Sequence, residues 1–345
     1  MTTMNADSFY KQAKDFLDLV FNLMKIKNFS IKNWSIDHLC YRVIDKNAYH
    51  QKKCDFSNFS KLLVESEVNG RLISTFKLNE PILYEDRIID LIELPEPKPN
   101  NNYKEGFEHF EVIVPVPFQT LIEENPHLHF DLSGLKKDFN QELKLKLDSV
   151  QIKFHQMSLE SVINLEQNQT IYSMIKESDI LSNLSQYGPL IAGTFPLNIS
   201  SDTSDIDLIL SAPDLVDLQR KLHSLYGGVS GFKDRFCKVE GVDSYIANFV
   251  LLDVPVEVFA QETPSVMQTA YAHFQVEEQI LKVAGFDFKN EIIKLRNQGL
   301  KTKLAFATAL KLKGEPFDAI LNLKGKTDLK LKLIVDARFS EFSNR

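Results

Sequence analysis

Two aspartates one residue apart, Asp205 and Asp207, stand in the string SSDTSDIDLIL. Ile206, Leu208 and Leu210 alternate with them, which predicts a strand with apolar side chains on one face and both carboxylates on the other. Two carboxylates this close repel each other unless a cation lies between them. A hard divalent cation such as Mg²⁺, bound also by the phosphates of a nucleotide, is therefore the expected occupant.

A third carboxylate and a glycine turn are expected beside this pair. In VLLDVPVEVFAQ, three valines alternate with polar or bulky residues, so Glu257 is predicted on the polar face of a neighbouring strand. Upstream, Gly193 allows the backbone to approach phosphate oxygens, and Thr194 can donate a hydrogen bond to them. Ser204, directly before the aspartates, is a further candidate for contact with a nucleotide.

A Gly-Thr turn, an Asp-x-Asp strand and a later acidic strand together resemble the motif of the DNA-polymerase-beta-like nucleotidyltransferase superfamily, which usually has Ser or Gly where Thr194 stands. Residues 186–321 also resemble an uncharacterised bacterial family grouped with it, in QETPSVMQTAYAHFQVEEQIL and GLKTKLAFATALKLKGEPFDAIL. The resemblance implies transfer of a nucleotidyl group from a nucleoside triphosphate to a hydroxyl or amine. Asp205 and Asp207 would hold Mg²⁺, and Glu257 would complete the site and help deprotonate the acceptor.

Four further side chains suited to metal binding lie in β-like runs of the first half, namely His38 in SIDHLCYRV, Glu93 in IIDLIELPEP, His109 in GFEHFEVIVP and His155 in QIKFHQMSLE. They form two pairs with the same plan, since a histidine opens each strand-rich unit and the second residue closes it. Two βαβββ units of this kind would bring the four side chains onto one axis. Glu111 shares a strand face with His109 and is a candidate neighbouring ligand or base.

Residues 7–163 resemble the YecM family in DHLCYRV, VNGRLISTFKLNEPI, IELPEPK, GFEHFEVIVP and KFHQMSLESVI. More broadly they resemble the vicinal oxygen chelate superfamily, whose paired modules form an open barrel around a divalent metal. The resemblance implies that the four side chains bind a transition metal such as Zn²⁺ or Ni²⁺. Glyoxalase-like members commonly have His, Glu, His and Glu at these positions. His155 in the last position is compatible with a metal site but counts against glyoxalase-type proton transfer.

Composition limits the class of protein. The chain has 345 residues, more than one average domain, so two domains are expected. Lys plus Arg is 40 against Asp plus Glu 47, a net charge of -7, which disfavours a broad nucleic-acid-binding surface and leaves a local basic groove open. Three unclustered cysteines indicate reduced thiols in a cytoplasmic protein. No apolar run is long enough to span a membrane, and the amino terminus has the pattern of an amphipathic helix.

Periodicity divides the chain. Strand patterns dominate from residue 36 to about 154, and longer helical patterns alternate with strands from about 171. The polar stretch at 165–170 is the expected linker between domains at 1–165 and 170–345. The tail KTDLKLKLIVDARF alternates well enough to be predicted as a strand. The predicted class is α+β, with an amino-terminal paired βαβββ vicinal-oxygen-chelate barrel and a carboxy-terminal nucleotidyltransferase-like α/β domain.

Two other functions remain open, and so does the oligomeric state. In the first, the amino-terminal metal site is the catalytic centre and the second domain senses nucleotides. In the second, the chain is a non-catalytic binding protein in which both metal sites are degenerate. Metal content separates the three: a nucleotidyltransferase needs added Mg²⁺, a chelate enzyme copurifies with a transition metal, and a degenerate protein holds neither.

Overall fold

The computed structural model describes residues 4–99, 104–137 and 139–343. These residues fall into two compact units. Unit 1 comprises Met1–Val114, Phe118–Leu159 and Thr327–Leu329, and unit 2 comprises Pro115–Pro117, Glu160–Lys326 and Lys330–Arg345. Each unit is described by itself. No helix in the described part of the chain is long and apolar enough to cross a membrane.

Unit 1 is built on one eight-stranded sheet in the order β2-β3-β4-β1-β5-β8-β7-β6. Its elements are α1 (Ala6–Ile26), β1 (Ile36–Arg42), α2 (Lys46–Phe56), β2 (Ser60–Val68), β3 (Arg71–Tyr84), β4 (Arg87–Pro95), β5 (Gly106–Ile113), α3 (Phe118–Glu123), β6 (Phe130–Asp131), the 3-10 helix η1 (Ser133–Lys136), β7 (Leu143–Leu147) and β8 (Val150–His155). β1 runs parallel to β4 and β5 parallel to β8, while β1 and β5 join the halves antiparallel. The predicted pair of βαβββ units is confirmed.

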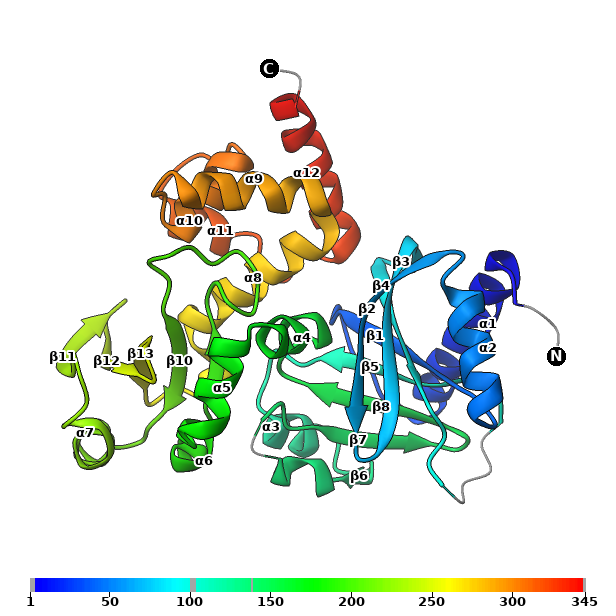
Figure 1. Cartoon of the computed structure of the whole chain (residues 1–345), viewed down its shortest axis with the longest axis horizontal. Helices are drawn as coiled ribbons and strands as arrows, with labels where there is room; N and C mark the ends of the chain where they lie inside the picture. The colour runs from blue at the N-terminus through cyan, green and yellow to red at the C-terminus, as the bar shows by residue number, and fades with distance from the viewer. Residues whose placement is uncertain (1–3, 100–103, 138, 344–345) are drawn as a thin grey trace. The chain divides into compact units, whose positions relative to one another are not determined.

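One face of this sheet carries the core of unit 1. α1 begins at its N-cap Asn5, whose side chain accepts a hydrogen bond from the amide of Ser8, and it buries a stripe of residues at helical spacing. α1 packs against β3 and β5, and α2 against β4 (Figure 1). A hairpin turn joins β2 and β3, in which Asn69 and Gly70 both have positive φ, at 52° and 74°. The opposite face of the sheet is left for polar side chains.

Unit 2 contains a five-stranded sheet in the order β11-β12-β13-β10-β9, in which only β10 and β13 pair in parallel. The elements along this part of the chain are α4 (Leu159–Gln167), α5 (Gln169–Glu177), α6 (Ile180–Asn183), η2 (Ser185–Tyr187), β9 (Leu190–Ala192), β10 (Ile206–Ser211), α7 (Leu215–Tyr226), β11 (Lys233–Val239), β12 (Val242–Leu251), β13 (Val254–Gln261), η3 (Ser265–Met267), α8 (Thr269–Ala284), α9 (Phe286–Asn297), α10 (Thr302–Ala309), α11 (Pro316–Leu321) and α12 (Asp328–Ser343). α5 lies against β13 and α7 against β12, while α8 to α11 pack on one another (Figure 1).

Two segments differ from the expected local structure. The stretch at 165–170 is helical almost throughout, since α4 ends at Gln167 and α5 begins at Gln169. The strand predicted for the tail is wrong, because residues 328–343 form α12. Leu331 and Val335 are buried four residues apart, whereas Leu333 is 69% exposed. The burial therefore has the period of a helix, and the alternating leucines and lysines only imitate a strand.

Candidate functional site

Unit 2 brings the three predicted carboxylates together. β10 and β13 pair in parallel with Asp207 directly opposite Glu257. Asp205 lies one residue before β10 begins, close enough for its charge to act on Asp207. The side-chain amide of Asn248, on β12, donates to Oε2 of Glu257 at 3.0 Å and so fixes that carboxylate. This hydrogen bond uses Oε2 of Glu257 and not Oε1.

Negative charge is concentrated in this cluster. Burial and then the charge of Asp205 raise the pKa of Asp207 from 3.8 to about 7, with smaller contributions in the same direction from Glu257 and Glu277. Lys303 opposes this rise. Like charges so placed cannot all ionise cheaply, and a divalent cation would remove the penalty. The donor set, three carboxylates, suits a hard ion such as Mg²⁺.

The turn after β9 is shaped around Asp207. Gly193 has φ of +82°, and a Cβ at this position would lie 1.8 Å from Oδ2 of Asp207, so only glycine fits. The hydroxyl of Thr194 donates to Oγ of Ser204 at 3.0 Å. Oγ of Ser204 also accepts from the amide of Ser201 at 2.9 Å. Thr194 and Ser204 therefore tie the turn to the loop before β10, and the hydroxyl of Thr194 donates to Ser204 rather than to a ligand.

Two cations beside this loop and these acids were not identified from the sequence. Arg296, near the end of α9, donates from Nη2 to the hydroxyls of Ser201 and Ser204 at 3.3 and 3.2 Å. Lys303, on α10, has its Nζ 3.4 Å from Oε1 of Glu277, a carboxylate on α8 that is only 1% exposed. Burial raises the pKa of Glu277, while Lys303 and Arg296 oppose this. Glu277 lies three residues from both Phe274 and Ile280, on the apolar face of a helical pattern, and this position was the signal that could have revealed the cluster.

In unit 1, the predicted ligands gather on the polar face of the sheet, around a carboxylate. β1 and β5 place His38 opposite Glu111 and Cys40 opposite His109. Nε2 of His38 and Nε2 of His109 lie 3.5 and 3.3 Å from Oε1 of Glu111. Nε2 of His155 lies 2.7 Å from the other oxygen, Oε2. Glu111, expected only as a neighbour, is thus the centre of the cluster, which we call the unit 1 cup.

Two bulges orient these histidines. The β1–β5 register skips Asp37 on one strand and Glu108 on the other, so each carboxylate lies beside the histidine that follows it. Asp37 Oδ2 is 2.8 Å from Nδ1 of His38, and Glu108 Oε2 is 3.0 Å from Nδ1 of His109. Burial lowers the pKa of His38, but Glu111 and Asp37 outweigh it and raise this pKa to about 10. At neutral pH His38 is an imidazolium.

The cup also contains an ammonium group. Lys153 Nζ lies 2.7 Å from Oε1 of Glu111. Glu93, on β4 opposite Cys40, is close enough for Lys153 to be the main influence that lowers its pKa against the opposing effect of burial. The carboxylates of the cup are therefore already paired with cations that belong to the protein.

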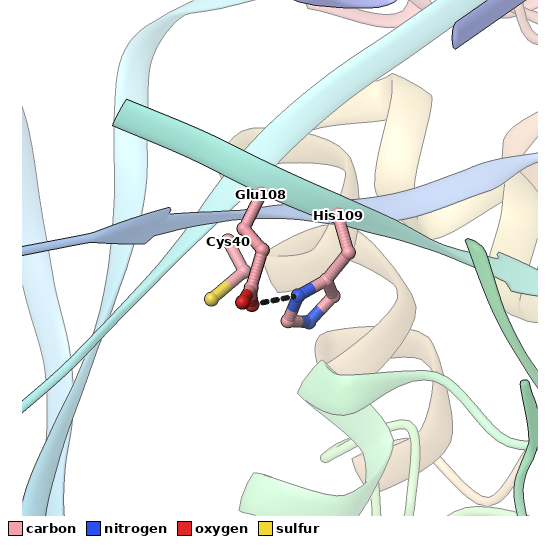
Figure 2. A group of neighbouring side chains, drawn as sticks. All are labelled: Cys40, Glu108 and His109. Carbon is pink, nitrogen blue, oxygen red and sulfur yellow. Dashed lines mark hydrogen bonds and ion pairs between the residues drawn. The ribbon is translucent and has the colours of Figure 1, made fainter. Parts of the chain in front are cut away.

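A second group in unit 1 has the residue types of a metal site. Cys40, Glu108 and His109 each offer a ligand atom, and these atoms lie within 4.8 Å of one another (Figure 2). The Glu108 carboxylate also pairs with Nε of Arg42 at 2.6 Å. Burial, followed by the charge of Glu93, raises the pKa of Cys40, so the sulfur is a thiol at neutral pH and not a ready nucleophile. The group could hold a metal ion that displaces the thiol proton.

Three polar residues at and just after the start of α8 have packing roles. Nε2 of Gln268 donates to the carbonyls of Leu210 and Thr263 at 2.7 and 2.8 Å, which joins the start of α8 to the end of β10. Tyr271 is completely buried. His273 is 4% exposed and meets the Phe317 ring edge-on.

Comparison with protein families gives one match in each half. The YecM protein family matches residues 5–166, and a domain of unknown function, DUF4269, matches residues 173–323. Protein YecM of Escherichia coli is 27% identical over 168 residues, which cover 44% of this chain and 89% of that protein. An uncharacterised protein of Haemophilus influenzae is 31% identical over 94 residues, 27% of this chain, and the chain spans about half (49%) of its length.

Several solved structures are similar to part of the chain. A protein described as EC4020 covers 47% of this chain and 97% of its own, with 24% identity and a TM-score of 0.40. A methylmalonyl-CoA epimerase of Streptomyces coelicolor covers 36% and 97%, with 16% identity and a TM-score of 0.28. A GLD-2/RNP-8 complex covers 51% and 66%, with 14% identity and a TM-score of 0.30. The chain thus joins a segment that matches the YecM family to a segment that matches the DUF4269 family.

Proposed function

We propose that unit 2 is a Mg²⁺-dependent nucleotidyltransferase, which transfers a nucleotidyl group from a nucleoside triphosphate to a hydroxyl or amine. The observation that carries the proposal is the pairing of Asp207 with Glu257 across β10 and β13, beside Asp205. The fit of the Gly193 turn against Asp207 supports it, because this turn leaves no side chain between the backbone and the carboxylates.

Each residue then has a specific task. Asp205, Asp207 and Glu257 would hold Mg²⁺, which supplies charge neutralisation and alignment of the phosphates. Glu257 is held at Oε2 by Asn248, so its other oxygen is the candidate acceptor for the proton of the attacking hydroxyl.

Arg296 and Lys303 would counter the charge of the phosphates. Arg296 is held beside the Ser201–Ser204 loop, and its Nε is buried without a hydrogen-bond partner. Lys303 is held by Glu277 and already acts on the charge of Asp207. Cations placed opposite a carboxylate cluster can attract the oxygens of a polyphosphate, and a metal ion held by the carboxylates would add to this attraction.

Thermal unfolding of the full chain with each nucleoside triphosphate, with and without Mg²⁺, tests this function. A ligand that binds the native state raises the transition temperature by mass action. We expect a rise that needs both the nucleotide and Mg²⁺, and that is absent when Asp205 and Asp207 are both replaced by Asn. Asp202→Asn, in the exposed part of the same loop, is the matched control. A nucleotide that shifts the double variant as far as the native protein would contradict the proposal.

A second candidate function concerns unit 1. The Cys40, Glu108 and His109 group favours binding of a divalent ion with affinity for sulfur and imidazole, such as Zn²⁺ or Ni²⁺. Metal content of the full chain, purified without chelators or nickel resin, tests it. Cys40→Ser should remove a bound ion, whereas Cys54→Ser, at an exposed cysteine of the same unit, should retain it.

A further inference from the structure

The two βαβββ units of the sheet are related position by position. Because β1 and β5 are antiparallel neighbours, His38 faces Glu111 and Cys40 faces His109. Exchange of the two units therefore exchanges His38 with His109, and Cys40 with Glu111. The bulge carboxylates follow the same relation, since each precedes its histidine and bonds to its Nδ1.

The same relation extends to the closing strands. In the parallel pair β1–β4, Glu93 lies opposite Cys40. In the parallel pair β5–β8, Lys153 lies opposite Glu111. Since Cys40 and Glu111 are counterparts, Lys153 is the counterpart of Glu93.

His155 occupies a different place from the one that a fourth ligand would need. It lies opposite Ile113, two residues beyond Lys153 on β8. Its Nε2 is 2.7 Å from Glu111 Oε2 and 3.6 Å from Oε2 of Glu142. His155 therefore lies beside the carboxylates of Glu111 and Glu142 instead of at the position related to Glu93.

The fit of a metal ion to the cup is thus incomplete. Nε2 of His38 and Nε2 of His109 are buried without hydrogen-bond partners, and their Nδ1 atoms are held by carboxylates, which is how metal-binding histidines are oriented. Lys153, however, brings an ammonium group with no lone pair to the position where a carboxylate would complete the set.

We propose that Lys153 is the resident cation of the unit 1 cup and excludes a divalent metal from the set His38, Glu93, His109 and His155. Its Nζ is 2.7 Å from Glu111 Oε1, the oxygen on which both histidines converge. A divalent ion at the same place would lie next to a fixed positive charge, and the repulsion at this distance is large inside a protein. The carboxylates it would need are already paired.

The presence of Lys153 limits the chemistry that unit 1 can perform. A cup neutralised by its own lysine offers no Lewis acid, so it does not support an enzyme that works through a metal ion in the cup. A metal ion in unit 1 would then be held through Cys40, at the group that shares only His109 with the cup.

Metal uptake by the full chain tests the exclusion, with every protein in a Cys40→Ser background so that the thiol contributes no ligand. Lys153→Glu restores the carboxylate at the position related to Glu93, and Lys153→Gln removes the charge with less change in size. Lys146→Glu is the matched control, because Lys146 is exposed on the neighbouring strand β7. Equilibrium dialysis against Zn²⁺, Ni²⁺ or Mn²⁺ alone, followed by elemental analysis, gives the bound metal, and circular dichroism verifies folding.

The Cys40→Ser protein and its Lys146→Glu variant should take up essentially no ion. Lys153→Glu should bind about one equivalent of metal ion, and addition of His38→Gln should abolish this binding. Lys153→Gln should bind the ion at least about tenfold more tightly than the Cys40→Ser protein that retains Lys153, since site changes alter metal affinity on this scale. Uptake of one equivalent by the Cys40→Ser protein, abolished by His38→Gln, would overturn the proposal. So would a folded Lys153→Gln protein with no gain in affinity.

Discussion

Replacement of Asp207 by Asn should stabilise unit 2 in the absence of divalent cations. The pKa of this carboxyl is raised from 3.8 to about 7 in the folded protein, so at pH 8 folding forces the group to ionise in an unfavourable place. A rise of about three units corresponds to about 4 kcal/mol. Asparagine has nearly the same shape and no charge, but its amide also loses hydration. We therefore expect a gain of about 1–3 kcal/mol at pH 8.

The stability of unit 2 should also depend on pH through the ionisation of Asp207. Between about pH 4 and 7 the folded Asp207 retains its proton while the unfolded chain has lost it, so the free energy of unfolding falls as pH rises through this window and levels off above it. In Asp207→Asn this contribution disappears. Asp202→Asn, an exposed aspartate close by in sequence, should behave as the native protein.

The assay must distinguish the two units. The single tryptophan, Trp34, lies in unit 1, so its fluorescence reports that unit during urea unfolding. Hydrogen exchange of peptides from β10 and β13 reports unit 2. Mg²⁺ at about a hundredfold excess over its dissociation constant should add about 2.7 kcal/mol to the native protein and almost nothing to Asp207→Asn. Equal stability of the two proteins at pH 8, or equal stabilisation by Mg²⁺, would refute the electrostatic reasoning.

Three further predictions follow from single positions. Gly193→Ala should lower the free energy of unfolding by at least about 2 kcal/mol, because its Cβ would meet Asp207. It should also abolish the rise in transition temperature that nucleotide and Mg²⁺ produce together. Gly228→Ala, with open space around it, should have neither effect in the same thermal assay. His38→Gln should remove the loss of unit 1 stability expected as pH rises from about 6.5 through 10, measured by Trp fluorescence in urea. If 165–170 is a linker, limited proteolysis should cut first at Asn168, the break between α4 and α5, although this break lies inside unit 2; resistance there would refute the linker.

The carboxylate cluster of unit 2 could be predicted because it depends on one rule. Side chains alternate along a strand, so the spacing of Asp205, Asp207 and Glu257 fixed which residues could share a face. The cations that complete the cluster could not be found in this way. Arg296 and Lys303 come from helices far along the chain, and only tertiary packing brings them to the acids.

The unit 1 cup shows where alternation is insufficient. A shift of two residues leaves a side chain on the same face, so His155 and Lys153 are equivalent in a sequence pattern, and only the β5–β8 register separates them. The bulges at Asp37 and Glu108 break the alternation itself and place acidic side chains beside the histidines. The strand prediction for the tail was wrong for a related reason. Over one or two helical turns, alternating Leu and Lys residues fit the pattern of a strand as well as that of a helix.

The two units differ in how the charge of their buried carboxylates is balanced. In unit 1, Glu111 is surrounded by Lys153 and by imidazoles, so its negative charge is balanced within the fold. In unit 2, the acids around Asp207 outweigh the opposing charge of Lys303, so the folded protein bears an electrostatic cost that a bound cation would remove. Groups held at such a cost are characteristic of sites that bind or react. A bound cation would relieve this cost, which supports the proposal that nucleotidyl transfer takes place in unit 2.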